Sequence, residues 1–173
     1  MTTEYILGLD LSLTAPGMAM VDGVEVLEPK SAGVVRLQQI RDWVLLGAGA
    51  RTKIAVIEGY SYASKFSRAH SLGELGGVVK VALVERGVDL HIVEPNVLKL
   101  FALGKGGGKG TKKNDMLRAA LAAGYAEETS DDNAIDAWWL RQFGLFADAF
   151  YEVPQTQYRH GAVGTWLTKR EAA

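Results

Sequence analysis

The chain has 173 residues, which is enough for one domain with a buried core. Hydrophobic residues make up 48% of it and charged residues 23%, a composition that excludes an intrinsically disordered chain. There is no cysteine, which excludes disulfides and cysteine-based zinc sites, and no apolar run approaches the roughly 18–20 residues that span a bilayer. We therefore expect a cytoplasmic protein with no membrane partner.

The charge of the chain is balanced overall but unevenly placed. Because the formal net charge is −1, any affinity for nucleic acid has to come from a local concentration of basic residues. Residues 97–113 contain no acidic residue and five lysines: Lys99, Lys105, Lys109, Lys112 and Lys113. This composition favours a surface that contacts phosphates, although a solvated loop would have it too.

The first half of the chain has the pattern of three strands, a helix and a fourth strand. The first three strands are expected over 4–11, 17–21 and 24–27, with Asp22-Gly23 as a tight hairpin turn. Apolar residues at helical spacing predict a helix over 33–46, and 53–58 has the composition of a buried strand.

The second half is mostly helical. We expect, in chain order, a helix over 67–86, a strand over 88–93, a short helix over 95–103, a glycine-rich loop over 104–110, and helices over 111–123 and 130–151. From Pro154 onward there is no clear periodicity, which predicts a docked or a partly disordered tail.

Together these elements predict an α/β fold. Its mixed five-stranded sheet would have three antiparallel strands followed by two helix-linked parallel strands, and helices would flank it. This domain is expected over residues 1–152, followed by a C-terminal tail over 153–173.

Two predicted strands carry an acid in an otherwise apolar environment. Asp10 lies in the run ILGLDL, and Glu58 directly follows the run IAVI. A buried charge is costly unless it is paired or coordinated, and ligands commonly bind at strand ends in α/β sheets. The alternative is that both are ordinary strand-end residues, with Asp10 capping a turn that contains Ser12 and Thr14.

The last long helix begins with the segment SDDNAIDA. At about 100° per residue, Asp132 and Asp136 lie on one helical face, and Asp131 points elsewhere. The alternative is that Asp131 and Asp132 only favour the helix N-terminus, with Thr129 and Asp132 as a capping pair. That alternative leaves Asp136 unexplained, because Asp136 lies beyond the first turn among apolar residues.

The chemistry of these four acids indicates a metal site. Asp10, Glu58, Asp132 and Asp136 would repel one another without a cation, and ligation by oxygen alone suits Mg²⁺ or Mn²⁺. Two such ions can activate a water and stabilise the leaving 3′ oxygen, which predicts phosphodiester hydrolysis.

With these residues identified, the chain resembles the RuvC family of Holliday junction resolvases, in the RNase H-like superfamily. Four segments carry the resemblance, in order: GLDLSLTAPGMAMVD with Asp10, AVIEGYSYA with Glu58, PNVLKLFALGKGGGKGTKKNDML, and DDNAIDA. The resemblance implies an RNase H-like nuclease domain and an endonuclease that resolves four-way junctions, and also forks and flaps, with two metal ions per active site. A phage-type member would act in the host cytoplasm.

By the same resemblance, Asp10, Glu58 and Asp136 correspond to metal ligands of the family. The chain has Asn133 where the family commonly has an acid, so the fourth ligand is either Asp132, which helix geometry favours, or Asn133. Lys112 and Lys113 correspond best to the basic residues that contact the phosphates at the cut, with Lys109 next and Lys99 and Lys105 in the same DNA-binding region.

The resemblance also suggests how DNA and a second subunit are contacted. Tyr60 and Tyr62, beside Glu58, would stack on unpaired bases, or alternatively pack in the core. Family members act as twofold dimers, and the helix over 67–86 resembles the dimer-forming element. We interpret the three histidines, His70, His91 and His160, as surface or packing residues rather than ligands.

Two other functions stay open from the sequence. One is a different RNase H-like nuclease that acts on RNA–DNA hybrids or in ribosomal RNA processing. The other is a nucleic-acid-binding module without catalytic activity, whose binding would not depend on the carboxylates.

Overall fold

A computed structural model describes residues 5–59, 66–105, 114–127, 129–149 and 157–171 of the chain. In this part of the chain, five strands form one sheet in the order β3-β2-β1-β4-β5. The strands are β1 (Ile6–Asp10), β2 (Gly17–Met20), β3 (Gly23–Val26), β4 (Ile54–Glu58) and β5 (Asp89–Val93). The pairs β1–β2 and β2–β3 are antiparallel, and β1–β4 and β4–β5 are parallel. The predicted α/β architecture is therefore confirmed.

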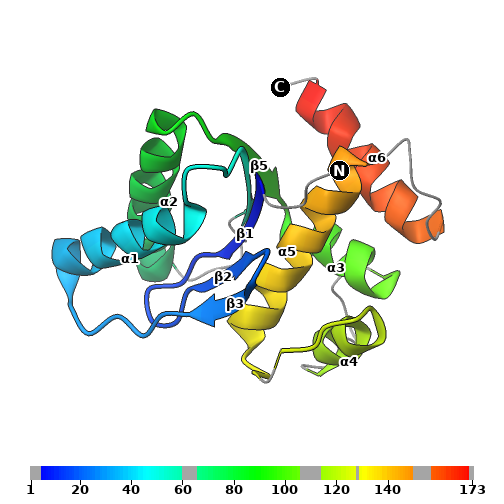
Figure 1. Cartoon of the computed structure of the whole chain (residues 1–173), viewed down its shortest axis with the longest axis horizontal. Coiled ribbons are helices and arrows are strands. Elements are labelled where there is room, and N and C mark those ends of the chain that lie inside the picture. The colour runs from blue at the N-terminus through cyan, green and yellow to red at the C-terminus, as the bar shows by residue number, and fades with distance from the viewer. Residues whose placement is uncertain (1–4, 60–65, 106–113, 128, 150–156, 172–173) are drawn as a thin grey trace.

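Helices cover both faces of this sheet (Figure 1). The described helices are α1 (Gly33–Ala48), α2 (Phe66–Glu85), α3 (Pro95–Leu103), α4 (Asp115–Ala122), α5 (Asp132–Asp148) and α6 (Gln157–Glu171). One hydrophobic core lies between the sheet and the pair α1 and α2, and a second lies between the sheet and the helices α3 to α6. None of the described helices is long and apolar enough to cross a membrane.

The alternation of side chains along the strands feeds both cores. In β1, Leu7 and Leu9 belong to the core under α1 and α2, whereas Ile6 belongs to the core under α5. In β4, Val56 likewise faces the α5 side, and its neighbours in sequence face the other side. Strands buried on both faces explain why their sequences are apolar without a break.

Three local predictions are corrected by the structure. The hairpin turn consists of Val21 and Asp22, because Gly23 already pairs with Met20 in the sheet; its φ of 147° is a conformation that favours glycine. Helix α4 begins at Asp115, later than the predicted residue 111, and α5 begins at Asp132, because Asp131 caps it. The predicted loop over 104–110 lies outside the described residues from 106 onward.

The tail after Pro154 contains a helix that its sequence pattern did not indicate. Over the described residues, α6 docks on the main domain through a short buried stripe, Ala162, Val163 and Trp166. These residues are flanked by polar and basic side chains, so the helical period is too weakly marked to recognise in a sequence. The docked alternative is therefore correct for residues 157–171.

Candidate active site

Two of the predicted carboxylates stand side by side at the end of the sheet. Because β1 and β4 are parallel and Leu9 is in register with Ile57, Asp10 and Glu58 occupy the next position on adjacent strands. Side chains alternate along a strand, so Asp10 lies on the same face as Ile6, and Glu58 on the same face as Val56. Both acids therefore face the layer that contains α5.

Helix α5 crosses this face unusually close to the sheet. A Cβ atom on Gly8 would lie 2.2 Å from the carbonyl oxygen of Ala137, and one on Gly17 would lie 2.1 Å from that of Asn133. Gly17 is the sheet partner of Asp10. Two glycines thus allow α5 to contact β1 and β2 through its backbone. The segment between those two contacts carries Asp136 to the end of the sheet where Asp10 lies.

The three carboxylates form one electrostatic cluster. Burial raises the pKa of Asp10 well above its ordinary value, and the charges of Glu58, Asp136 and Asp131 raise it further. The pKa of Glu58 is raised to about 7, chiefly by burial and then by Asp136. The pKa of Asp136 is raised to about 6, again chiefly by burial. Neighbouring carboxylates therefore make the ionisation of Asp10 and Glu58 more costly, as expected where acids converge.

A lysine from a different element opposes this negative charge. The Lys99 charge lowers the pKa of both Glu58 and Asp136, so α3 brings this lysine near enough to the two carboxylates to act on their ionisation. Its side chain is half-buried, on a helix fixed by the buried Leu98 and Phe101. The sequence placed Lys99 in a general DNA-binding region. What the sequence missed is that Lys99 belongs to the carboxylate cluster, because no local pattern connects residue 99 with residues 58 and 136.

Comparisons with known proteins agree with this architecture. No family model matches the sequence, and no curated protein matches it. Among solved structures, Thermus thermophilus RuvC matches with a TM-score of 0.68 at 20% identity, over 84% of this chain and 96% of that chain. T. thermophilus RuvC in complex with a Holliday junction substrate matches with a TM-score of 0.64 at 20% identity, over 83% and 94%.

The chain has a RuvC-like fold.

Around the carboxylate cluster, the start of α5 differs from the sequence prediction. Asp131 is the helix cap, since its carboxylate accepts hydrogen bonds from the amides of Asn133 at 2.9 Å and Ala134 at 3.3 Å. The alternative of a Thr129–Asp132 capping pair is therefore wrong; the Thr129 hydroxyl accepts a hydrogen bond from the Asp131 amide instead. The Asp131 charge also raises the pKa of Asp10, as the last and smallest of the contributions to that shift.

The two candidates for a fourth ligand lie in different environments. Asp132 is exposed, and its charge raises the pKa of Asp136, which agrees with their predicted common face. Asn133 is half-buried, and its backbone lies against Gly17, the sheet partner of Asp10. Asp132 thus lies at the solvent side of the cluster, and the backbone of Asn133 at the sheet side.

The turn after β1 is stabilised by a residue other than Asp10. The Ser12 hydroxyl accepts hydrogen bonds from the amides of Thr14 and Ala15, both at 3.3 Å. The alternative interpretation of Asp10, that it caps this turn, therefore loses its basis. Asp10 is therefore a buried acid beside other carboxylates, an arrangement that a bound cation would stabilise.

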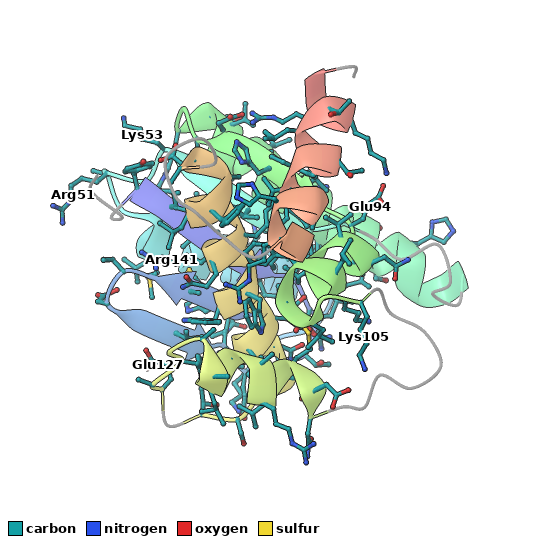
Figure 2. The ribbon with its side chains drawn as sticks, turned by 90° about the vertical axis from the view of Figure 1, so that its right-hand side faces the viewer. Arg51, Lys53, Glu94, Lys105, Glu127 and Arg141 are labelled. Carbon is teal, nitrogen blue, oxygen red and sulfur yellow. The ribbon has the colours of Figure 1, made fainter. Side chains whose placement is uncertain are left out.

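Of the remaining residues predicted to contact DNA, Lys105 is within the described part of the chain. Lys109, Lys112, Lys113, Tyr60 and Tyr62 lie outside the described residues. Lys105 is exposed beside α4 and lies 3.9 Å from the carboxylate of Asp115 (Figure 2).

The three histidines occupy surface or packing positions, as predicted from the sequence. His70 is exposed, His91 packs against Trp166 with ring centroids 5.1 Å apart, and His160 packs against Phe146. Another buried polar residue on α5, Arg141, has a structural role, because its Nε donates a hydrogen bond to the Ile6 carbonyl at 3.1 Å (Figure 2).

The oxygen ligands that these carboxylates offer are of the kind that a hard divalent cation prefers. Asp10, Glu58 and Asp136 offer only oxygen ligands, and their mutual repulsion is what a cation would relieve. As their side chains are placed, no three Asp, Glu, His or Cys residues within the described ranges are close enough to hold an ion. The acids are thus gathered at one end of the sheet without forming a closed cage.

Proposed function

We propose that this protein is a divalent-metal-dependent endonuclease that resolves Holliday junctions and related branched DNA. The observation that carries the proposal is the gathering of Asp10, Glu58 and Asp136 at one end of the sheet, opposed by Lys99. The fold supports it, because a similarly folded protein, T. thermophilus RuvC, has been solved in complex with a Holliday junction substrate. Mg²⁺ or Mn²⁺ is the proposed cofactor, with two ions per site.

In this mechanism Asp10, Glu58 and Asp136 would hold the cations. When bound, the ions supply an activated water and stabilise the leaving 3′ oxygen. The three carboxylates have to be ionised to bind the cations. Because the pKa of Glu58 is about 7 and that of Asp136 about 6, these two acids ionise fully only above neutral pH in the absence of metal. A fourth ligand would come from Asp132 or Asn133.

Lysines complete the proposed site by binding the substrate's phosphates. Lys99 lies close enough to Glu58 and Asp136 to act on their ionisation, so we propose that it contacts the scissile phosphate. Lys105, Lys109, Lys112 and Lys113 follow α3 in sequence and are proposed to hold the flanking DNA backbone. The tyrosines Tyr60 and Tyr62 follow Glu58 and are proposed to stack on bases exposed at the crossover.

The proposed active form is a homodimer that cuts opposing strands. Helix α2 supports this with an exposed stripe at helical spacing, formed by Gly73, Gly77, Val81 and Val84. A Cβ atom at Gly73 or Gly77 would meet nothing within 4 Å, so a second copy of α2 could approach closely there. Val81 and Val84 are more than half exposed, which leaves apolar surface to bury.

A cleavage panel tests the proposed activity. Purified protein with Mg²⁺ or Mn²⁺ is mixed with four-way junctions, forks, flaps, linear duplex and RNA–DNA hybrid. We expect cleavage of junctions over duplex by at least about tenfold, and Asp10→Asn should bind junctions with unchanged affinity but lose at least about 100-fold in cleavage rate. Asp42→Asn, on the exposed face of α1, is the matched control and should cut normally.

Each other outcome has a distinct meaning. Preferred cleavage of the RNA–DNA hybrid would replace the junction substrate with the alternative nuclease function. Binding that is equal in wild type and Asp10→Asn, with no cleavage in either metal, would indicate a non-catalytic binding module. Asp132→Asn and Asn133→Ala, compared in the same panel, identify the fourth ligand as the position with the larger loss.

A further inference from the structure

Helix α6 is fixed to the edge of the sheet by its C-terminal half. The Trp166 indole donates a hydrogen bond to the Ile92 carbonyl of β5 at 2.7 Å. The same ring packs against His91 at 5.1 Å and against Phe143 of α5 at 5.4 Å, both measured between ring centroids. Arg170 forms an ion pair with Asp89 at the start of β5. This end of α6 is therefore anchored on two elements of the main domain.

The N-terminal half of α6 reaches a different element, α3. Arg159 donates a hydrogen bond from Nε to the Phe101 carbonyl at 3.4 Å. Its guanidinium carbon also lies 5.3 Å from the centre of the Phe101 ring and 5.5 Å from that of Trp139. Phe101 lies in the last turn of α3, where carbonyls lack partners within the helix and a cation is favourable. Arg159 thus holds the C-terminal end of α3 from outside.

Helix α3 is the element that presents Lys99 to the carboxylates. It is short, nine residues long, and Lys99 precedes Phe101 by two positions. A shift or rotation of its last turns would therefore move the Lys99 ammonium relative to Glu58 and Asp136. Phe101 is itself surrounded by the rings of Trp139, Phe143 and Phe146. Arg159 adds a hydrogen bond to this apolar packing. Because a hydrogen bond depends on direction and apolar packing does not, Arg159 restricts the rotation of α3.

We propose that α6 acts as a brace for the active site, and that Arg159 is a positioning residue that sets the place of Lys99 through α3. The proposal rests on the proposed nuclease function for its kinetic consequence, but its structural consequence is independent of it. Arg159 acts through Lys99 and does not itself touch the DNA.

The structural consequence is tested by hydrogen exchange of the full chain without DNA. In Arg159→Ala, the amides of the last turn of α3, such as Gly104, whose N–H bonds to the Leu100 carbonyl, should exchange at least about fivefold faster than in wild type. Amides of α1 should not change. Arg41→Ala, a charged residue on α1 paired with its neighbour Asp42, is the matched control and should leave α3 unchanged.

The kinetic consequence is tested by a double-mutant cycle with Lys99→Met. If Arg159 acts through Lys99, Arg159→Ala should lower kcat about tenfold in the wild-type background, with KM changed less than about twofold. In the Lys99→Met background the same change should lower kcat by less than about twofold. A general loss of stability would lower both backgrounds equally, so the cycle separates positioning from folding.

Two results would overturn the brace: equal losses of kcat in both backgrounds, or unchanged exchange in the last turn of α3. If Arg159→Ala does not fold, Trp166→Phe removes the hydrogen bond to Ile92 while keeping a ring and is measured in the same way. Should the wild-type protein cut no DNA, the proposed function fails, and the exchange measurement still decides whether α6 orders α3.

Discussion

At the scale of single residues, the fold makes the acids of the candidate site harder to ionise. Asp10, Glu58 and Asp136 are raised in pKa first by burial and then by neighbouring carboxylates, and Lys99 offsets this at Glu58 and Asp136. A carboxylate whose pKa is raised on folding binds protons more tightly in the folded state. The folding stability it contributes is therefore fully present below its unfolded pKa and is lost as pH rises through its folded pKa.

Glu58 gives this effect a defined pH window. Its pKa rises from 4.5 to about 7, so the metal-free protein should lose stability between these pH values. Glu58→Gln removes the charge, and we expect it to stabilise the metal-free protein at pH 8 by about 1–3 kcal/mol and to have almost no effect at pH 4. Urea unfolding with a chelator, at both pH values, measures the difference.

The control for this measurement is an exposed glutamate. Glu28→Gln, which removes a surface ion pair with Lys30, should change stability by less than about 0.5 kcal/mol at either pH. Adding Mg²⁺ should stabilise wild type more than Glu58→Gln, because only wild type keeps the full ligand set. A gain in Glu58→Gln of the same size at pH 4 and pH 8 would mean that charge is not its cause.

At the scale of elements, the position of α5 decides whether the acids meet. Gly8 and Gly17, on the strands, let the helix backbone contact the sheet. Gly144, on α5 itself, lets the helix lie against the Val56 side chain of β4, since a Cβ atom there would be 2.5 Å from Val56 Cγ2. The sequence predicted α5 itself, with its acid face. It did not predict the closeness of the approach, because a glycine in a strand has several possible explanations.

Gly8→Ala tests this arrangement. The new methyl group would lie 2.2 Å from the Ala137 carbonyl, so α5 has to move away from β1. We expect a loss of about 2–4 kcal/mol in the free energy of unfolding, and a loss of cleavage that exceeds the loss of folded protein, because Asp136 moves away from Asp10. Gly161→Ala is the control: α6 has open space there, and alanine should stabilise the helix by about 0.5–1 kcal/mol. Wild-type stability in Gly8→Ala would show that the close approach is not required.

At the scale of the whole molecule, the two faces of the sheet carry different roles. Helices α1 and α2 lie on one side of the sheet and α5 on the other (Figure 1). The side with α5 holds the candidate site, and α1 and α2 expose apolar side chains. A groove of about 610 Å³, lined by residues of α1 and α2 that include Val34 and Gly77, adjoins the exposed stripe of α2. Such a surface next to helical glycines is suited to a second copy of the chain.

Val81→Glu tests the proposed dimer. A charge in the middle of the α2 stripe would be buried between two copies, so we expect dimer dissociation to become at least about 100-fold more favourable. Light scattering coupled to size exclusion should give twice the chain mass for wild type and the chain mass for the variant. Leu121→Glu, an equally exposed apolar residue on α4, is the control and should stay dimeric. A monomeric wild-type protein at micromolar concentration would contradict the dimer.

The sequence by itself determined the features that depend on neighbouring residues. The apolar strands that end in Asp10 and Glu58, the helical spacing of Asp132 and Asp136, and the order of elements through α5 are all recognisable within short windows. These patterns were sufficient for three antiparallel strands followed by two parallel ones, because short connections and the handedness of crossovers leave few ways to arrange the strands. They also identified the acids of the candidate site as a group.

Only the tertiary structure decided how distant segments meet. Asp131 caps α5, although Thr129 was an equally plausible cap in the sequence. Helix α6 docks through three buried side chains. The charge of Lys99 acts on acids that are more than 30 positions distant in the chain. Contacts of this kind depend on how closely two elements pack and on how each is rotated, which glycines and aromatic side chains from several elements set together. No single segment contains that information, so the site became specific only when the chain was folded.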